Sequence, residues 1–214
     1  MEQAIREANQ KLNLLNSITR HDIVNQLTMI QGFTQIATMK AQDPVITDYL
    51  TKINTGATTI HRQIEFMKTY QDMGVRTPGW FRIDETIANV AQESVTCSGT
   101  CQTTEVFADP MLEKVFFNLF ENSLRHGERV TEIRISCEQV PEGLMVIVED
   151  NGIGIPREEK EKIFEKGFGK NTGLGLFLVK EILAITGITI RETGIPGQGA
   201  RFEILVPKGQ YRFV

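Results

Sequence analysis

The chain has 214 residues, 41% of them hydrophobic and 23% charged, which is ordinary for a globular protein and excludes collagen-like, disordered and disulfide-scaffold classes. Its net charge of −4 argues against nucleic-acid binding, which usually needs a basic face. No stretch approaches the roughly 18 apolar residues of a membrane span, and the first residues lack the apolar core of a signal peptide. We therefore expect a cytoplasmic chain with no membrane segment, any membrane anchor of the parent protein lying upstream.

Glycine divides the chain into two halves. Of 18 glycines, two lie within residues 1–73 and 12 lie within residues 143–214. Glycine weakens helix interiors and suits turns and close backbone contacts. The distribution therefore predicts a helical first part and a loop-rich second part.

The three cysteines suit a reducing compartment. Cys97 and Cys101 have a C-x3-C spacing, which metal and redox pairs can use, but no second Cys or His pair follows nearby. We interpret Cys97, Cys101 and Cys137 as loop and strand thiols.

Residues 1–72 are expected to form a helical hairpin. The first helix begins with a coiled-coil seam, Pro44 separates the two helices, and the second helix carries an apolar stripe. Because one hairpin buries little surface, two copies should pair as a homodimeric four-helix bundle. The seam consists of Ile5, Ala8, Leu12 and Leu15, and the stripe of Ile46, Tyr49, Ile53, Ala57, Ile60, Ile64 and Met67.

Residues 73–79 read as a linker, and residues 80–214 as a second domain in which helices and strands alternate. Asp84 is expected to cap a helix to about residue 94, and Asp109 with Pro110 a helix to about residue 126. The fold class is α+β, a helical hairpin followed by an α/β sandwich. The predicted strands are 80–83, 103–108, 132–139, 144–149, 188–192 and 200–207, and a further helix covers 173–186.

Asn118 and Asn122 lie one turn apart on the polar side of helix 109–126, with Arg125 and His126 a further turn on. Asparagine is a mediocre helix former, so the pair calls for an explanation. One interpretation is a solvated polar face. The other is a metal and phosphate site, because amide carbonyls are hard ligands for Mg²⁺ and arginine donates to phosphate oxygens.

Asp150 follows an apolar strand and opens the segment DNGIGIP. A carboxylate at a strand end can accept a hydrogen bond from an exocyclic amine, and Gly152 and Gly154 allow backbone to approach a flat ligand. The alternative interpretation is an ordinary turn after a strand.

A second glycine-rich segment runs straight into a helix. Gly173 and Gly175 leave N–H groups at the helix start accessible to an anion, which the helix dipole favours. Lys170 and Thr172 add a positive charge and a hydroxyl. The alternative is a glycine-rich loop without a ligand.

The hairpin contains the segment His21-Asp22-Ile23-Val24-Asn25. Imidazole can act as a nucleophile, Asp22 can hold or take its proton, and Asn25 lies one turn on and can hold a water molecule. A solvated histidine is the alternative for His21, and it is the only interpretation we give His61.

Together and in this order, these elements strongly resemble a sensor histidine kinase, from about residue 10 to residue 207. The hairpin segment is similar to the H box, NLFENSLRHG to the N box, DNGIGIP to the G1 box, Phe164 and Phe168 to the F box, and TGLGL to the G2 box. The resemblance implies an ATP-binding domain of the Bergerat (GHKL) fold, with ATP and Mg²⁺ as cofactors.

The resemblance also implies residue roles. His21 would attack the γ-phosphate with Asp22 as general base, and Asn25 would serve dephosphorylation of a response-regulator receiver domain. Positioning and charge neutralisation would supply most of the catalysis. Upstream, the coiled coil would join a sensory module. In the nucleotide site, Asp150 would bind the adenine amine, and Asn122 would ligate Mg²⁺ with support from Asn118. Arg125 would meet phosphate, and His126 would belong to the same site at a position where the family often has an aromatic residue. Gly173, Leu174 and Gly175 would start the helix beneath the phosphates.

Two other functions compete with this one. A GHKL ATPase would place a catalytic glutamate one turn before the metal-binding asparagine, where this chain has Asn118. A degenerate dimeric signalling scaffold would not need His21, Asn122 and Asp150 intact.

Overall fold

A computed structural model of the chain describes the backbone of residues 2–90, 96–99, 101, 103–169 and 173–214, and the side chains of these residues outside 2–18 and 96–99. The chain divides into two compact units, residues 1–69 and 70–214. Within the described part, none of the helices combines the length and the apolar character needed to cross a bilayer.

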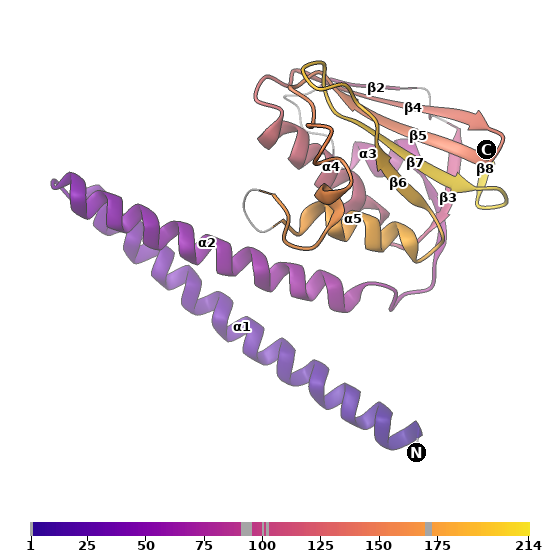
Figure 1. Cartoon of the computed structure of the whole chain (residues 1–214). Helices are drawn as coiled ribbons and strands as arrows, with labels where there is room; N and C mark the ends of the chain where they lie inside the picture. Colours follow the sequence, from indigo (N-terminus) through magenta and orange to yellow (C-terminus); the bar gives the residue numbers. More distant parts are fainter. Residues whose placement is uncertain (1, 91–95, 100, 102, 170–172) are drawn as a thin grey trace. The chain divides into compact units, whose positions relative to one another are not determined.

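The first unit is an antiparallel helical hairpin (Figure 1). Helix α1 spans Glu2–Lys40 and helix α2 spans Pro44–Asp72, so the chain turns at the predicted break. Leu27 and Ala57 are buried, and Gln31 donates a hydrogen bond to Oγ1 of Thr58 across the hairpin at 3.1 Å. The side chains of the predicted coiled-coil seam lie outside the described residues.

The second unit contains two sheets. The larger one has the order β2-β4-β5-β7-β6, in which β2 runs parallel to β4 and the other neighbours are antiparallel; the smaller one has the order β1-β3-β8 and is antiparallel throughout. The strands are β1 Gly79–Arg82, β2 Thr96–Gly99, β3 Thr104–Ala108, β4 Glu132–Val140, β5 Gly143–Asp150, β6 Thr189–Glu192, β7 Arg201–Pro207 and β8 Tyr211–Phe213.

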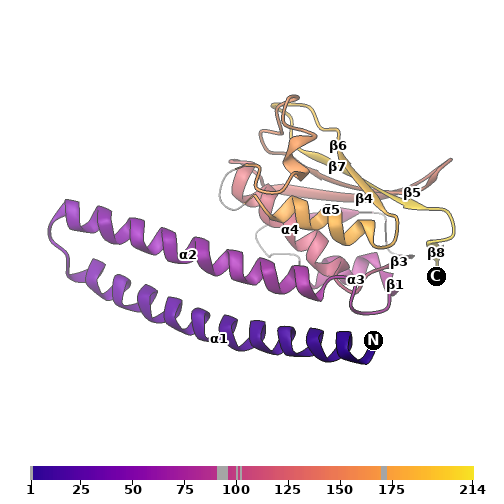
Figure 2. The same ribbon diagram turned by 60° about the horizontal axis from the view of Figure 1, so that its bottom comes forward.

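Helices of the second unit lie on one face of the larger sheet (Figures 1 and 2). They are α3 Ile83–Ala88, α4 Leu112–His126 and α5 Gly175–Ala184, with a short 3-10 helix η1 at Lys162–Phe164. Alternating residues of the strands and one face of α4 and α5 form the apolar core between the layers. Its fully buried side chains include Val115, Phe116, Leu119, Ile133, Leu144, Val146, Val148, Val179 and Ile182.

The α+β class is confirmed, while several boundaries differ from the prediction. The helix expected over 84–94 ends at Ala88, and its residues 91–94 lie outside the described residues. Helix α4 begins at Leu112, because the carboxylate of Asp109 accepts the N–H of Met111 at 2.8 Å and forms a turn before the helix. Helix α5 spans Gly175–Ala184 instead of 173–186, and strands β2 and β8 were not predicted.

The interpretation of the cysteines as free thiols is wrong for two of them. Cys101 and Cys137 form a disulfide with their Cα atoms 5.3 Å apart, a separation that suits this bond. The sequence spacing drew attention to Cys97 and Cys101, whereas the fold brings Cys101 to a residue of another strand.

Candidate nucleotide and phosphoacceptor sites

The carboxylate of Asp150, the last residue of β5, is held by three hydrogen bonds. Its Oδ1 accepts the N–H groups of Gly152 at 2.9 Å and Ala200 at 3.0 Å, and its Oδ2 accepts the hydroxyl of Ser123 at 2.7 Å. A carboxylate has about four acceptor positions, so Oδ2 retains one for a further donor. The arrangement fixes one carboxylate orientation and leaves it able to bind an external N–H group.

Glycines allow three segments to meet around Asp150. A Cβ atom at Gly152 would lie 2.8 Å from Cα of Gly127, and one at Gly199, where φ is +125°, would lie 1.8 Å from the carbonyl oxygen of Asp150. Gly154 also has a positive φ of +70°. The sequence predicts that Gly152 allows backbone to approach a ligand closely. In the structure, Gly152 also allows the backbone at Gly127 to approach closely.

The side chains of Asn118 and Asn122 on α4 face the start of α5. A Cβ atom at Gly175 would lie 3.4 Å from Oδ1 of Asn118 and 3.8 Å from Nδ2 of Asn122. Asn118 donates to the carbonyl of Lys114 at 2.9 Å, whereas Nδ2 of Asn122 is buried without a hydrogen-bond partner. A buried amide of this kind is costly unless a ligand satisfies it.

This unsatisfied amide fits a magnesium-bound phosphate group. Asn122 can present either its nitrogen or its carbonyl oxygen by rotation of the amide, and the oxygen is a hard ligand. Mg²⁺ usually combines one or two such side chains with substrate phosphates.

Arg125 and His126 end helix α4 and are both exposed. Arg125 forms an ion pair with Glu121 one turn earlier, Nη2 to Oε1 at 2.5 Å. The expected contact of Arg125 with phosphate and the place of His126 in the nucleotide site both stay predictions.

The glycine-rich segment before α5 folds back on itself. The N–H of Gly167 donates to the carbonyl of Gly173 at 3.0 Å, and Gly173 has a positive φ of +60°. Leu174 follows, and its carbonyl accepts the N–H of Leu178 at 3.0 Å. Lys170 and Thr172 lie outside the described residues.

Phe164 anchors the segment between the two glycine-rich motifs. It is 7% exposed and meets the ring of Phe202 edge-to-face, with centroids 6.4 Å apart. Phe168 is half-buried. The packing of Phe164 ties the segment to strand β7.

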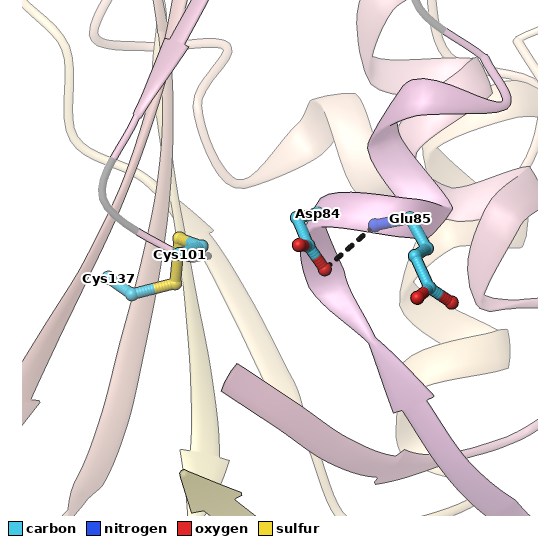
Figure 3. Close-up of a disulfide and its surroundings, with 4 residues drawn as sticks. All are labelled: Asp84, Glu85, Cys101 and Cys137. Atoms are coloured by element: carbon cyan, nitrogen blue, oxygen red, sulfur yellow. Dashed lines mark hydrogen bonds between the residues drawn. A yellow bond between two sulfur atoms is a disulfide. The ribbon is translucent and has the colours of Figure 1, made fainter. Parts of the chain in front are cut away.

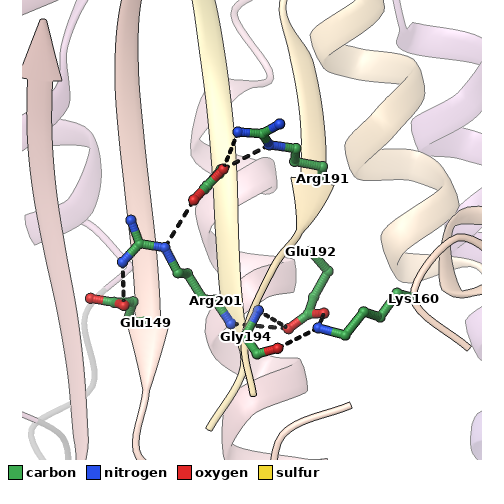
Figure 4. Close-up of polar contacts among 7 residues, drawn as sticks. Glu149, Lys160, Arg191, Glu192, Gly194 and Arg201 are labelled. Atoms are coloured by element: carbon green, nitrogen blue, oxygen red, sulfur yellow. Dashed lines mark hydrogen bonds and ion pairs between the residues drawn. The ribbon is translucent and has the colours of Figure 1, made fainter. Parts of the chain in front are cut away.

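Sequence reasoning missed a second anchor of this segment, which Figure 4 shows. Lys160 forms an ion pair with Glu192 of β6, whose side chain is fully buried, and also donates to the carbonyl of Gly194. The other oxygen of Glu192 accepts the N–H groups of Gly194 at 2.9 Å and Arg201 at 3.2 Å. The sequence shows only that Glu192 is a glutamate in a short predicted strand. This does not identify Lys160, 32 residues away, as its partner.

An ion-pair network continues from there to the residue before Asp150 (Figure 4). Arg201 pairs with Glu149 at 2.5 Å and with Glu203 at 3.0 Å, and Glu203 also pairs with Arg191. Burial raises the pKa of Glu203, but hydrogen bonds from Arg201 and Arg191 outweigh this effect and lower that pKa below its ordinary value.

The hairpin brings His21, Asp22 and Asn25 together on α1. Nδ1 of His21 lies 3.3 Å from Oδ1 of Asp22, and Nδ2 of Asn25 lies 3.3 Å and 3.4 Å from the two ring nitrogens. The side chains of His21 and Asp22 are 74% and 65% exposed, so the imidazole is accessible. Although adjacent residues point to different helix faces, Asp22 reaches the ring.

Comparison with known proteins matches part of the chain to a family and finds similar proteins along its whole length. Residues 108–210, which run from the end of β3 to the start of β8, match the family described as histidine kinase-, DNA gyrase B-, and HSP90-like ATPase. The signal transduction histidine-protein kinase AtoS of Escherichia coli is 28% identical over 97% of the chain, hairpin included. Over this length the chain is similar to histidine kinases. The alginate biosynthesis sensor protein KinB of Pseudomonas aeruginosa is 42% identical over 45% of the chain.

Solved structures share the fold of this chain. The complex of histidine kinase ThkA with the response regulator TrrA covers 96% of the chain and 64% of the solved chain, with a TM-score of 0.62 and 24% identity. Full-length ShkA in complex with AMPPNP covers 94% of the chain and 46% of the solved chain, with a TM-score of 0.65 and 17% identity. The chain itself spans 17% of KinB and 36% of AtoS.

Proposed function

We propose that the chain is the kinase core of a two-component sensor, which transfers the γ-phosphoryl group of ATP to His21 and then to an aspartate of a response-regulator receiver domain. The buried, unsatisfied amide of Asn122 beside Gly175 is the observation that carries this proposal, because a ligand at the start of α5 would satisfy it.

The nucleotide lies between α4, the end of β5 and the start of α5. Its adenine amine donates to the open position on Oδ2 of Asp150, which the three existing hydrogen bonds hold in place. Backbone N–H groups after Gly173 meet the phosphates at the N-terminus of α5. Further contacts come from Asn118, Arg125, His126, Gly152, Gly154, Lys170, Thr172, Leu174 and Gly175.

Bound Mg²⁺ would neutralise phosphate charge and orient the transferred group. Asn122 is the side chain that would hold it, through its amide oxygen. AMPPNP in the ShkA complex supports the assignment of ATP as the nucleotide.

In the hairpin, Asp22 accepts a hydrogen bond from the Nδ1–H group of His21, so the lone pair on Nε2 is free to act as the nucleophile. Nε2 forms a bond to the γ-phosphorus while the bond to the β-γ bridging oxygen breaks and ADP leaves. Asp22 takes the Nδ1 proton as the ring becomes cationic. Asn25 withdraws from the ring for this step and orients the water molecule that later hydrolyses the regulator phosphate.

A homodimer would cover the exposed apolar side chains of the hairpin. So many exposed apolar side chains on one hairpin indicate an interaction site. Two hairpins would bury it as a four-helix bundle, with the coiled coil leading to a sensory module upstream. The exposed residues are Met29, Ile30, Phe33, Ile36, Ile46, Tyr49, Ile53, Ile60 and Met67.

A response regulator would be the partner, as in the ThkA–TrrA complex, and a cytoplasmic location would supply ATP and that partner.

Incubation with γ-labelled ATP tests the proposal. We expect an acid-labile, alkali-stable label on the chain, lost in His21→Ala and retained in His61→Ala, the matched histidine of α2. Label persisting in His21→Ala would reject the acceptor. Phosphate release without labelled protein would favour the ATPase, and neither label nor nucleotide binding would favour the scaffold.

A further inference from the structure

The disulfide extends the pairing of an edge strand. Strand β2 lies at the edge of the five-stranded sheet, where its four residues pair in parallel with β4 from Thr96 opposite Glu132 to Gly99 opposite Ile135. Cys101 and Cys137 are also 36 residues apart, so they continue this register beyond the last backbone pair. The bond therefore fixes β2 to the sheet at the end where its pairing stops (Figure 3).

The segment enclosed by the disulfide carries part of the nucleotide site. Residues 101–137 contain β3 and α4, and α4 supplies Asn118, Asn122 and Ser123. Closing a loop restricts the conformations of the enclosed chain. A short parallel pair at a sheet edge is weakly held by backbone bonds alone. Whether Cys101 and Cys137 are joined as a disulfide or free as two thiols can thus change the conformational freedom of residues 101–137, which include α4.

The two cysteine residues differ in exposure. Cys101 is 4% exposed, whereas Cys137 is half-buried. An attacking thiolate therefore reaches Cys137 first, and Cys101 leaves as the thiolate. In a reducing compartment, persistent disulfides are rare and those that form are usually catalytic or redox-sensing.

We propose that Cys101 and Cys137 form a reversible redox site in the nucleotide-binding unit, and that the disulfide form binds ATP more tightly than the dithiol form. The coupling to ATP rests on the proposed function. Oxidation exchanges the two thiols with a low-molecular-weight disulfide, which is reduced to two thiols. Reduction by a dithiol gives a mixed disulfide at Cys137 and then the free thiols, and the dithiol leaves as its own disulfide.

Peptide mapping after alkylation tests the bond itself. We expect the chain treated with oxidised glutathione to contain a Cys101–Cys137 cross-link with Cys97 alkylated, and the chain treated with dithiothreitol to have all three cysteines alkylated. A cross-link involving Cys97, or a Cys101–Cys137 bond that survives dithiothreitol in the folded chain, would overturn the proposal.

Equilibrium binding of a fluorescent ATP analogue tests the coupling. The parent chain and Cys97→Ser should bind about fivefold more tightly when oxidised, as for modest coupling between sites. Cys137→Ser, and Cys101→Ala as a second variant, should show the weaker affinity under both conditions. Equal affinities of the oxidised and reduced parent would overturn the proposal.

The melting temperature separates this proposal from the proposed function. A melting temperature that rises on oxidation in the parent and in Cys97→Ser, but not in Cys137→Ser, supports the redox site. That result without any nucleotide binding would leave the reversible redox site standing, and would count against the kinase function and the coupling that rests on it.

Discussion

Ser123 donates its hydroxyl hydrogen to Oδ2 of Asp150 over 2.7 Å, so helix α4 and the end of strand β5 meet at one carboxylate. The serine follows Asn122, whose amide faces α5. Two adjacent residues of α4 would therefore contribute to opposite ends of the nucleotide site. Ser123 orients the carboxylate that would accept the adenine amine, and Asn122 would approach the phosphates.

Ser123→Ala should weaken nucleotide binding. A hydrogen bond to a charged group contributes about 1.5–3 kcal/mol, and the lower value corresponds to about a tenfold rise in Kd. Calorimetry with AMPPNP would measure the change, and Ser136→Ala in β4 is the matched control, with no expected effect. Unchanged affinity of Ser123→Ala would mean that the carboxylate does not need this donor.

Gly199→Ala should destabilise the second unit far more than Gly197→Ala. Both glycines have positive φ values, +125° and +87°, so both variants pay the conformational cost of about 1–2 kcal/mol. Only at Gly199 would the new Cβ meet backbone, 1.8 Å from the carbonyl of Asp150. We expect a further loss of at least about 2 kcal/mol, or failure to fold. Thermal unfolding followed by circular dichroism measures the stability of both variants. Equal melting temperatures of Gly199→Ala and Gly197→Ala would contradict the predicted steric clash at Gly199.

The sequence predicts helices and strands with a clear hydrophobic periodicity better than it predicts the short strands at the edges of the two sheets. The two helices of the hairpin and the long strands β4 and β5 follow from apolar spacing, and the break between the helices follows from Pro44. Strands β1 and β6, of four residues each, were predicted, but strands β2 and β8, of four and three residues, were not. Their pairing depends on neighbours far along the chain.

Some residues of the candidate site could be predicted from local sequence patterns, and others could not. The polar side of α4 and the glycine-rich motifs are local patterns, and they identified Asn122 and Asp150. Ser123, Lys160 and the Cys101–Cys137 bond were missed, because each has a partner far along the chain that only the tertiary fold brings close.

Asn25→Ala should separate the two proposed activities of the hairpin. Asn25 lies within 3.4 Å of the His21 ring but has no proton-transfer role in the kinase step. We expect dephosphorylation of a phosphorylated receiver domain to slow about 100-fold, as when a transition-state hydrogen bond is lost, with a much smaller change in autophosphorylation. Asn54→Ala on α2 is the control. Equal losses in both assays would argue that Asn25 acts through His21 itself.

Glu203→Gln should lower stability in a pH-dependent way. Because hydrogen bonds from Arg201 and Arg191 lower the pKa of Glu203 below 4.5, the carboxylate stabilises the fold above that pH. This contribution is lost as the pH falls from about 4.5 through the lowered pKa. The parent should therefore have the higher melting temperature at pH 7, and the difference should shrink below pH 4.5. Glu138→Gln, at an exposed position of β4, should show no such difference.

Lys160→Met should lower the free energy of unfolding by about 3 kcal/mol, because it leaves the buried carboxylate of Glu192 without its cation. Two backbone N–H groups still bind that carboxylate, which keeps the loss at the lower end of the range for buried pairs. Chemical denaturation measures it, and Arg134→Met, which removes an exposed ion pair, should change stability by less than about 0.5 kcal/mol. Adding Glu192→Gln to Lys160→Met should restore part of the loss, since the amide oxygen still accepts the backbone hydrogen bonds without a buried charge. No recovery in the double variant would show that Lys160 acts through its packing instead of its charge.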